Sequence, residues 1–233
     1  VLMHAVVTHA AARLEPQYRQ TQGAEGYVCA QVNPARAGDR EAMLEMARRF
    51  AGWAPNIAVK LPVTAAGLDV LEECVAEGIT VTATVSFTVP QVVAVGERHR
   101  RGVSRAREAG RVPGHAFAVI MIGRLDDYLR DVAHDRRAGV AEEDIRLAGL
   151  AVTKRAYDIY RAEGYEAVLL VAALRGNYHM TELAGARLIM SVHPRNQAAL
   201  MAPGVPREER IEAPVPGDAV QRLCAIPEFV RAY

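Results

Sequence analysis

The sequence predicts an α/β protein in which strands and helices alternate around a parallel sheet. From Tyr27 onward, short apolar runs of strand length alternate with longer amphipathic runs of helical period, as in proteins built from β–α units. No Gly-x-Gly-x-x-Gly turn follows any of the apolar runs, although an open, doubly wound sheet remains an alternative. We therefore favour a barrel of about eight β–α units. The six apolar runs would leave the first two strands of such a barrel missing.

The predicted strands are short and rich in Val, Ile, Leu and Ala, which is typical of strands buried in a parallel sheet. In chain order they are Tyr27–Val32, Asn56–Pro62, Val81–Phe87, His115–Gly123, Ala167–Leu174 and Arg187–His193. The segment Val1–Leu14 precedes them and is apolar and partly helical. We expect the native domain to begin upstream of Val1.

The predicted helices lie between these strands and carry apolar residues at helical spacing. In one of them Val70, Leu71, Cys74 and Val75 share a face, and Gly78 follows as a C-terminal stop. The helices are Arg40–Trp53, Thr64–Glu77, Pro90–Ala109, Leu125–Arg137 and Glu142–Glu163, followed by a proline-rich loop over residues 202–216 and a last helix, Asp218–Ala225.

The composition is that of a globular protein with balanced charge. Of the 233 residues, 51% are hydrophobic, which suffices for a core, yet no uncharged run reaches the roughly 18 apolar residues of a membrane span. Lys and Arg number 28 and Asp and Glu 27, so the net charge of +1 does not indicate a nucleic-acid-binding protein. The three cysteines are far apart and form neither a disulfide framework nor a metal motif. We expect a cytoplasmic protein without a leader or a membrane partner.

Lysine is rare in this chain, and one lysine lies on a predicted strand. Only Lys60 and Lys154 are lysines among the 28 basic residues. Side chains alternate along a strand, and the apolar Ile57, Val59 and Leu61 must face the surrounding helices, so Lys60 points to the inside of the sheet or barrel. We expect Lys154, in a long amphipathic helix, to lie on a solvated helix face.

The same alternation places more polar side chains in this interior. The inward-facing residues are expected to be Cys29, Gln31 and Asn33 on one strand and Thr82, Thr84 and Ser86 on another. The apolar residues between them, including Val85, are expected to face the helices. Three neighbouring strands would therefore line a polar cavity that contains one lysine.

A lysine in such a cavity can act as a nucleophile. Loss of solvent favours the neutral amine, and a neutral amine condenses with a carbonyl to a Schiff base that accepts electrons. The alternative is a buried Lys60 paired with a carboxylate, since buried lysines are rare unless paired or functional. No acidic residue points inward on the predicted strands, which favours the nucleophile.

Two predicted strands end in arginine, Arg124 and Arg175. Both would lie at the carboxyl-end rim, where barrel enzymes bind phosphates, and a guanidinium fits a phosphate dianion. The alternative for either arginine alone is a surface ion pair. Near the same rim, Asp126 and His179 are acid or base candidates, but loop polar groups are the favoured interpretation.

Six segments, the lysine strand among them, form a combined pattern. They are Asn56-Ile-Ala-Val-Lys-Leu-Pro-Val-Thr-Ala-Ala-Gly-Leu68, Glu77-Gly-Ile79, Thr82-Ala-Thr-Val-Ser-Phe-Thr-Val-Pro-Gln91, Gly123-Arg-Leu-Asp-Asp127, Ala148-Gly-Leu-Ala-Val-Thr-Lys-Arg-Ala-Tyr157 and Ile226-Pro-Glu-Phe229. From about Ala11 to the C-terminus, the chain resembles the transaldolase family. The resemblance implies a class I aldolase-type (β/α)8 TIM barrel, as one domain over residues 1–233 without its first two strands. It also implies transfer of a dihydroxyacetone unit between sugar phosphates, without a metal or organic cofactor.

The resemblance also implies roles for individual residues. Lys60 matches the Schiff-base lysine, and Thr84 matches the threonine that helps to hold the catalytic water. Gln31 stands where transaldolases usually have a glutamate sharing that water, and the fructose-6-phosphate aldolase branch has glutamine there. Arg124 and Arg175 match the phosphate-binding arginines.

Other positions depart from the family pattern. Thr82 stands where an asparagine that contacts the substrate is common, and Val119 replaces a serine five residues before the first arginine. With Thr82, we expect the inward-facing Asn33 and Ser86 to contact the substrate. The aspartate of the family's first strand and the Asn-Pro-Ser/Thr motif of its second are not found in the sequence.

These departures leave two alternatives to a transaldolase of the pentose phosphate type. One is an aldolase of the fructose-6-phosphate type that uses free dihydroxyacetone or another small ketone. The other is a non-catalytic relative that binds sugar phosphates or assembles with a partner. The expected partners are a ketose phosphate donor and an aldose phosphate acceptor, and the oligomeric state is left open, a homo-oligomer included.

Overall fold

The computed structural model describes residues 2–233 and contains two compact units. The first unit comprises the residues before Val85 together with Ala94–Ala118. The second comprises Val85–Val93 and Val119–Tyr233. Both are built from helices and parallel strands, so the predicted α/β class is confirmed.

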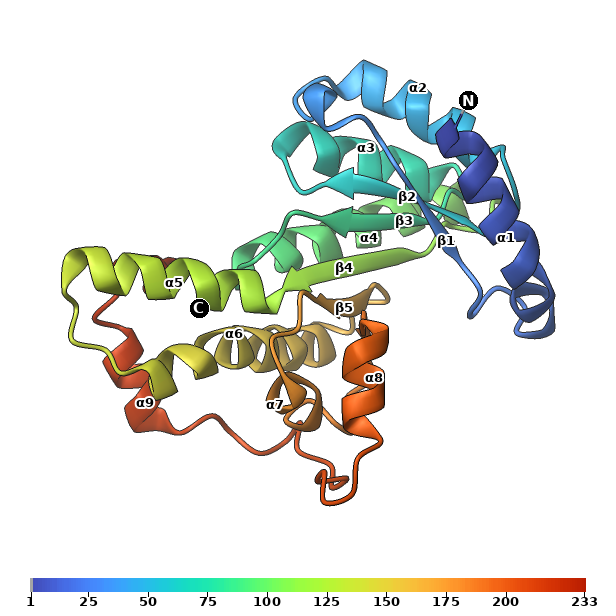
Figure 1. The fold of residues 1–233 in the computed structure, drawn as a ribbon. Helices are drawn as coiled ribbons and strands as arrows, with labels where there is room; N and C mark the ends of the chain where they lie inside the picture. The colour runs from blue at the N-terminus through green and yellow to red at the C-terminus, as the bar shows by residue number, and fades with distance from the viewer. Residues whose placement is uncertain (1) are drawn as a thin grey trace. The chain divides into compact units, whose positions relative to one another are not determined.

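The first unit holds parallel strands that lie side by side in chain order (Figure 1). Its strands are β1 (Val28–Gln31), β2 (Ile57–Pro62), β3 (Val81–Thr84) and the first half of β4 (Ala116–Met121). Its helices are α1 (Leu2–Gln20), the 3-10 helix η1 (Pro34–Arg36), α2 (Arg40–Ala51), α3 (Ala65–Ala76) and α4 (Val89–Glu108) from Ala94 onward. The strand order shows none of the reversal that defines a doubly wound sheet.

Helices α2 and α3 cover one face of these strands (Figure 1). The core between them contains Val59 and Leu61 of β2 and Leu71 of α3, all buried as expected. Helix α3 begins immediately after the lysine strand because the Thr64 hydroxyl accepts a hydrogen bond from Gly67 N. Gly67 is needed there, since a Cβ would lie 1.9 Å from the Pro62 carbonyl oxygen. The lysine strand is therefore fixed at its carboxyl end.

A buried asparagine attaches α1 to the start of the lysine strand. Asn56 Nδ2 donates to the carbonyls of Ala11 in α1, at 2.9 Å, and of Gly26, at 2.8 Å. Asn56 and Ala11 are fully buried. Helix α1 therefore lies at the amino end of β2, opposite the end from which α3 starts.

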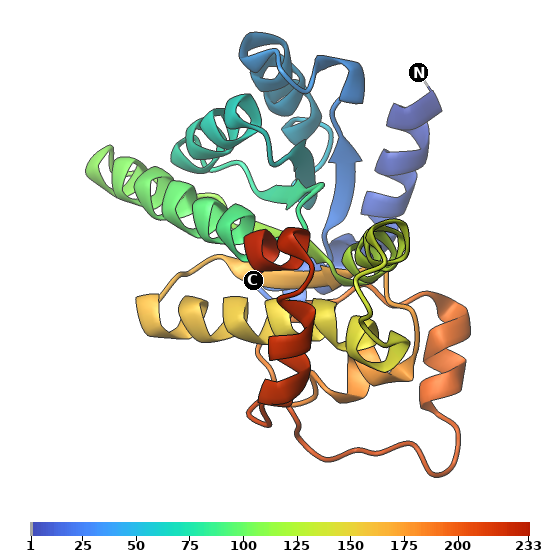
Figure 2. The same cartoon turned by 90° about the vertical axis from the view of Figure 1, so that its left-hand side faces the viewer.

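The second unit packs long helices against short strands (Figure 2). Its elements are the start of α4, the end of β4, α5 (Ile122–Arg136), α6 (Glu142–Glu163), β5 (Val168–Ala172), α7 (Asn177–Thr181), β6 (Ile189–Met190), α8 (Pro194–Leu200), α9 (Gly217–Leu223) and α10 (Pro227–Ala232). Helix α6 packs against both α5 and α9, and β5 pairs with β6 in parallel. Leu129, Leu150, Leu223 and Phe229 are fully buried in this unit.

The strands in the structure are shorter than the predicted ones, and for two of them the structure shows what replaces the missing residues. The strand predicted as Val81–Phe87 ends at Thr84, because Val85 adopts a left-handed backbone with φ of 59°. Val85 is 53% exposed and does not face the helices, so that expectation was wrong. The strand predicted as Arg187–His193 keeps only Ile189–Met190, and His193 instead caps α8 through its side chain.

The prediction for Lys154 was also wrong, because its side chain is buried. Its ammonium donates to the carbonyls of Arg210, at 2.8 Å, and Ala213, at 2.6 Å. Glu182 Oε2 lies 3.5 Å away. Burial lowers the pKa of Lys154 below its ordinary value of 10.5. Lys154 therefore ties the loop around residues 210–213 to α6, an interaction that helical periodicity does not reveal.

Candidate functional site

One row of side chains crosses four strands of the first unit on the face that carries Lys60. In the parallel register Gln31 pairs with Lys60, Lys60 with Thr82, and Thr82 with Phe117. Residues paired in this way point to the same face of a sheet. The structure therefore brings three predicted site residues together and adds one aromatic residue that the sequence analysis did not select.

The surroundings of Lys60 differ from side to side. Lys60 is half-buried, Gln31 is exposed and Thr82 is only 3% exposed. Thr84, also buried, pairs with Pro62 and so lies one step further toward the carboxyl ends. Within residues 2–233, Lys60 takes part in no ion pair. The described residues therefore do not form the alternative arrangement, in which a carboxylate neutralises Lys60.

Phe117, the aromatic residue of this row, contacts Tyr27, which directly precedes β1. The Tyr27 ring meets the Phe117 ring edge to face, with centroids 5.5 Å apart, and Tyr27 donates its hydroxyl to the Gly23 carbonyl at 2.7 Å. Burial raises the pKa of Tyr27 above its ordinary value. Side chains alternate along the strand predicted as His115–Gly123, so Phe117 points to the same face as the polar His115. The sequence pattern could therefore have placed Phe117 on this face.

Two further predicted contacts are engaged with backbone groups. Asn33 is exposed and caps η1, its Oδ1 accepting from Ala35 N at 3.0 Å. Ser86, in the second unit, is fully buried and donates to the Val119 carbonyl at 2.5 Å. These bonds hold the chain at the ends of β1 and β3. A substrate contact by either side chain stays a prediction.

The second unit contains both predicted phosphate-binding arginines. Arg124 is exposed in the first turn of α5 and has no ion pair within the described part of the chain. Arg175 follows β5 and is paired with Asp127, its Nε and Nη2 lying 3.1 Å and 2.5 Å from Oδ2. The Arg175 guanidinium holds the pKa of the Asp127 carboxyl below its usual range. For Arg175, the ion-pair alternative is therefore present in the structure.

A glycine lets the start of α5 approach the end of β5. A Cβ on Gly123 would lie 2.2 Å from the Ala173 carbonyl oxygen and 2.5 Å from Arg175 Cγ. No side chain fits at that position without moving the backbone. Because Gly123 directly precedes Arg124, this contact brings the two arginine-bearing segments together within the second unit.

Asp126 and His179 form a fully buried pair beneath Arg175. His179 Nε2 lies 2.9 Å from Asp126 Oδ2, and Asp126 Oδ1 accepts from Gly149 N at 2.8 Å. His179 Nδ1 accepts from the backbone N–H of Arg175 at 3.1 Å. Neither side chain has any solvent exposure. Both are buried groups that connect α5, α6 and α7. They are not the polar loop groups that we expected.

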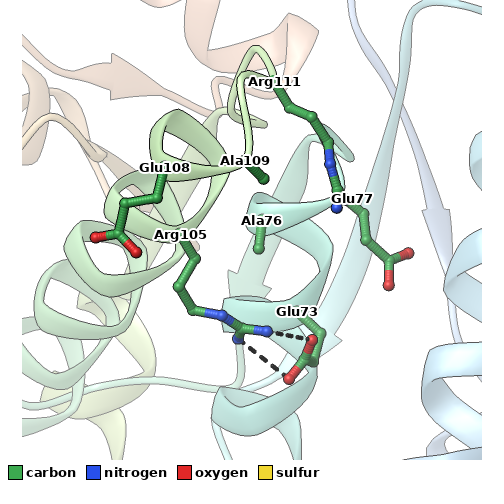
Figure 3. A pocket seen from close by; sticks show the side chains of 7 residues that line it. All are labelled: Glu73, Ala76, Glu77, Arg105, Glu108, Ala109 and Arg111. Atoms are coloured by element: carbon green, nitrogen blue, oxygen red, sulfur yellow. Dashed lines mark hydrogen bonds and ion pairs between the residues drawn. The ribbon is translucent and has the colours of Figure 1, made fainter.

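A separate groove lies on the outer side of the first unit, between α3 and α4 (Figure 3). It is lined by Glu73, Ala76, Glu77, Arg105, Glu108, Ala109 and Arg111. Arg105 is engaged by Glu73, its Nη2 lying 2.9 Å from Oε2. None of the predicted site residues lines this groove, and its charges largely neutralise one another.

Residues 2–233 include no helix that is both long and apolar enough to cross a membrane. In the same range no three His, Cys, Asp or Glu side chains gather as they would around a metal ion.

Comparison with known proteins identifies the family. The family model described as "Transaldolase/Fructose-6-phosphate aldolase" matches residues 1–223. The chain therefore belongs to the transaldolase/fructose-6-phosphate aldolase family, and the predicted resemblance is confirmed.

Individual relatives match part of the chain. A "Probable transaldolase" of Dehalococcoides mccartyi is 31% identical over 160 residues, which cover 69% of this chain and 58% of the relative. A "Transaldolase" of Mycobacterium bovis is 32% identical over 155 residues, or 64% of this chain and 41% of the relative. "Transaldolase 1" of Streptomyces avermitilis is 33% identical over 166 residues, or 67% and 42%. The matched regions thus span about half the length of these relatives.

Proposed function

We propose that the protein is a transaldolase-like transferase that moves a dihydroxyacetone unit between sugar phosphates through a Schiff base on Lys60. The observation that carries the proposal is the half-buried Lys60 without a carboxylate partner, in one row with Gln31 and Thr82. Family membership and the names of the relatives support it. We further propose that residues 1–233 form one domain with six strands of a (β/α)8 barrel, and that the enzyme works in the cytoplasm.

The proposed reaction proceeds through covalent steps on one amine. The neutral Lys60 amine adds to the ketose carbonyl, and uptake of one proton with loss of water gives a protonated imine. A base removes the proton of the C4 hydroxyl, the C3–C4 bond breaks, and its electron pair moves into the imine as an enamine. The aldose phosphate leaves, and the enamine adds to the aldehyde of the acceptor. Water then hydrolyses the new imine and releases the product ketose, regenerating Lys60.

The other site residues have proposed supporting roles. Thr84 and Gln31 position the water that takes part in proton transfers. Arg124 and Arg175 bind the substrate phosphate, which suits two cationic groups that can each donate several N–H bonds. The remaining proposed substrate contacts are Thr82, Asn33 and Ser86.

An aldolase of the fructose-6-phosphate type is the second candidate. The observation that favours it is Gln31, because an amide replaces the glutamate that transaldolases usually have at this position. Such an enzyme would release free dihydroxyacetone instead of handing it to an acceptor. A non-catalytic binding protein is the third candidate, and it would bind sugar phosphates without breaking a bond.

A transfer assay separates the three candidates. Fructose 6-phosphate is supplied with and without an aldose phosphate acceptor, and the released triose phosphate is measured. Without the acceptor a transaldolase releases at most one equivalent of triose phosphate per enzyme, because the enamine stays on Lys60, whereas an aldolase releases many equivalents. Lys60→Arg abolishes either activity because arginine forms no imine. Binding of fructose 6-phosphate without any release in the wild-type protein would leave only the binding protein.

A further inference from the structure

Two successive aspartates hold Arg175 by separate routes. Asp127 contacts the guanidinium, and Asp126 contacts His179, which in turn holds the Arg175 backbone. We infer that Asp127 and His179 are positioning residues that aim Arg175 at a phosphate group, and that Asp126 fixes the tautomer of His179. The inference rests on the proposed phosphate role of Arg175 and extends it to residues that do not touch the substrate.

The side-chain route leaves part of the guanidinium available. A guanidinium has five N–H donors, one on Nε and two on each terminal nitrogen. Asp127 accepts from Nε and Nη2, and the Ala173 carbonyl accepts from Nη1 at 2.8 Å. One donor remains on Nη1 and one on Nη2. Asp127 therefore fixes the plane of Arg175 without using the two donors that could bind an anion together.

The backbone route depends on one histidine tautomer. His179 Nδ1 accepts from the Arg175 N–H and so carries no proton. Nε2 must then carry the imidazole proton, which it donates to Asp126 Oδ2. The other oxygen of Asp126 accepts from the Gly149 N–H of α6. Each group in this series of hydrogen bonds has a defined donor or acceptor role, and Asp126, His179 and Gly149 are buried.

The location of Arg175 explains why it needs such support. It lies in the short link between β5 and α7, after Ala173, whose φ of 62° is left-handed. Within this link the Arg175 backbone N–H bonds to the His179 side chain and not to a strand partner. A shift of about 1 Å in a substrate-binding group is enough to weaken its contribution. The buried pair would prevent that shift.

Two substitutions at His179 separate the two hydrogen bonds. In His179→Asn the amide oxygen can replace Nδ1 as acceptor for the Arg175 N–H, but nothing reaches Asp126. In His179→Gln the amide nitrogen can replace Nε2 as donor to Asp126, but the Arg175 N–H loses its acceptor. Both variants lose one hydrogen bond, and the bond lost in His179→Asn is the one to a buried carboxylate. A purely structural role therefore predicts the larger effect for His179→Asn. Thermal unfolding is measured first to show that each variant is folded.

The kinetic readout compares phosphorylated and unphosphorylated donors. We expect His179→Gln to raise KM for fructose 6-phosphate by about tenfold, the effect of losing one useful hydrogen bond, with little change in kcat. In His179→Asn, KM for fructose 6-phosphate should stay within about threefold of the wild-type value. Borohydride trapping of the imine with dihydroxyacetone, which has no phosphate, should be unchanged in both. Equal KM values for the two variants, or an equal loss with dihydroxyacetone, would overturn the positioning role.

Three further measurements keep the outcomes distinct. If Arg175→Ala leaves KM for fructose 6-phosphate unchanged, the proposed phosphate role of Arg175 is wrong. If Arg175→Ala raises KM and His179→Gln does not, only the positioning role is wrong.

Nitrogen NMR of the wild-type protein should show His179 with its proton on Nε2, and a proton on Nδ1 would contradict the inference even if both variants unfold. Asp127→Asn, at a partly exposed position, should also raise KM for fructose 6-phosphate but not for dihydroxyacetone.

Discussion

At the scale of single residues, Lys154 shows why lysine is kept in a chain that otherwise uses arginine. Its ammonium sits between the carbonyls of Arg210 and Ala213, with Glu182 nearby. A compact ammonium with three donors fits this arrangement, whereas a planar guanidinium is larger and points its donors differently. The structure thus explains Lys154 by its hydrogen bonds, whereas the explanation for Lys60 is the chemistry that we propose for it.

We predict that Lys154→Arg destabilises the protein by about 2 kcal/mol. The buried guanidinium would not fit the positions of the two carbonyls, and these carbonyls would lose their hydrogen-bond donor. Urea unfolding measures the free energy. The matched control is Arg207→Lys, which exchanges the same two residue types at an exposed position of the same loop and should change stability by less than about 0.5 kcal/mol. Equal stabilities of Lys154→Arg and wild type would show that the ammonium is not required.

At the scale of elements, the local sequence pattern predicts some ends of helices and strands and misses others. The helix predicted over Glu142–Glu163 has these bounds in the structure, because strong periodicity and the stop at Gly164 agree. The end of β3 was mispredicted, since the left-handed backbone of Val85 is unusual for a β-branched residue. Local sequence pattern does not encode such a conformation, which tertiary contacts impose.

The attachment of α1 to β2 makes a prediction at this scale. Asn56→Asp should destabilise the protein by about 3 kcal/mol, because a buried carboxylate would face the Ala11 and Gly26 carbonyls without a donor between them. Chemical unfolding provides the measurement. Gln20→Ala removes an exposed amide from the last residue of α1 and should have almost no effect. An Asn56→Asp protein as stable as wild type would mean that this attachment contributes little.

At the scale of the whole molecule, strand register gathers site residues that are far apart in the sequence. Alternation along the predicted strands was enough to select Gln31, Lys60 and Thr82, which the register places in one row. The partner of Arg175 could not be predicted, because Asp127 lies 48 positions away and only folding brings the two together. The bonds made by Asn33 and Ser86 were missed for a different reason. Strand alternation gives the face of a side chain but not the backbone group that it binds.

The central claim is that Lys60 forms a Schiff base with a ketose. The most direct measurement is borohydride reduction with fructose 6-phosphate, followed by intact mass and peptide mapping. Because the chain has only two lysines, the peptide containing Lys154 is an internal control in the same sample. The account predicts one reduced adduct, on Lys60, that is absent in Lys60→Arg. A folded wild-type protein that gains no adduct at any ketose concentration, or that gains one only on Lys154, would contradict it.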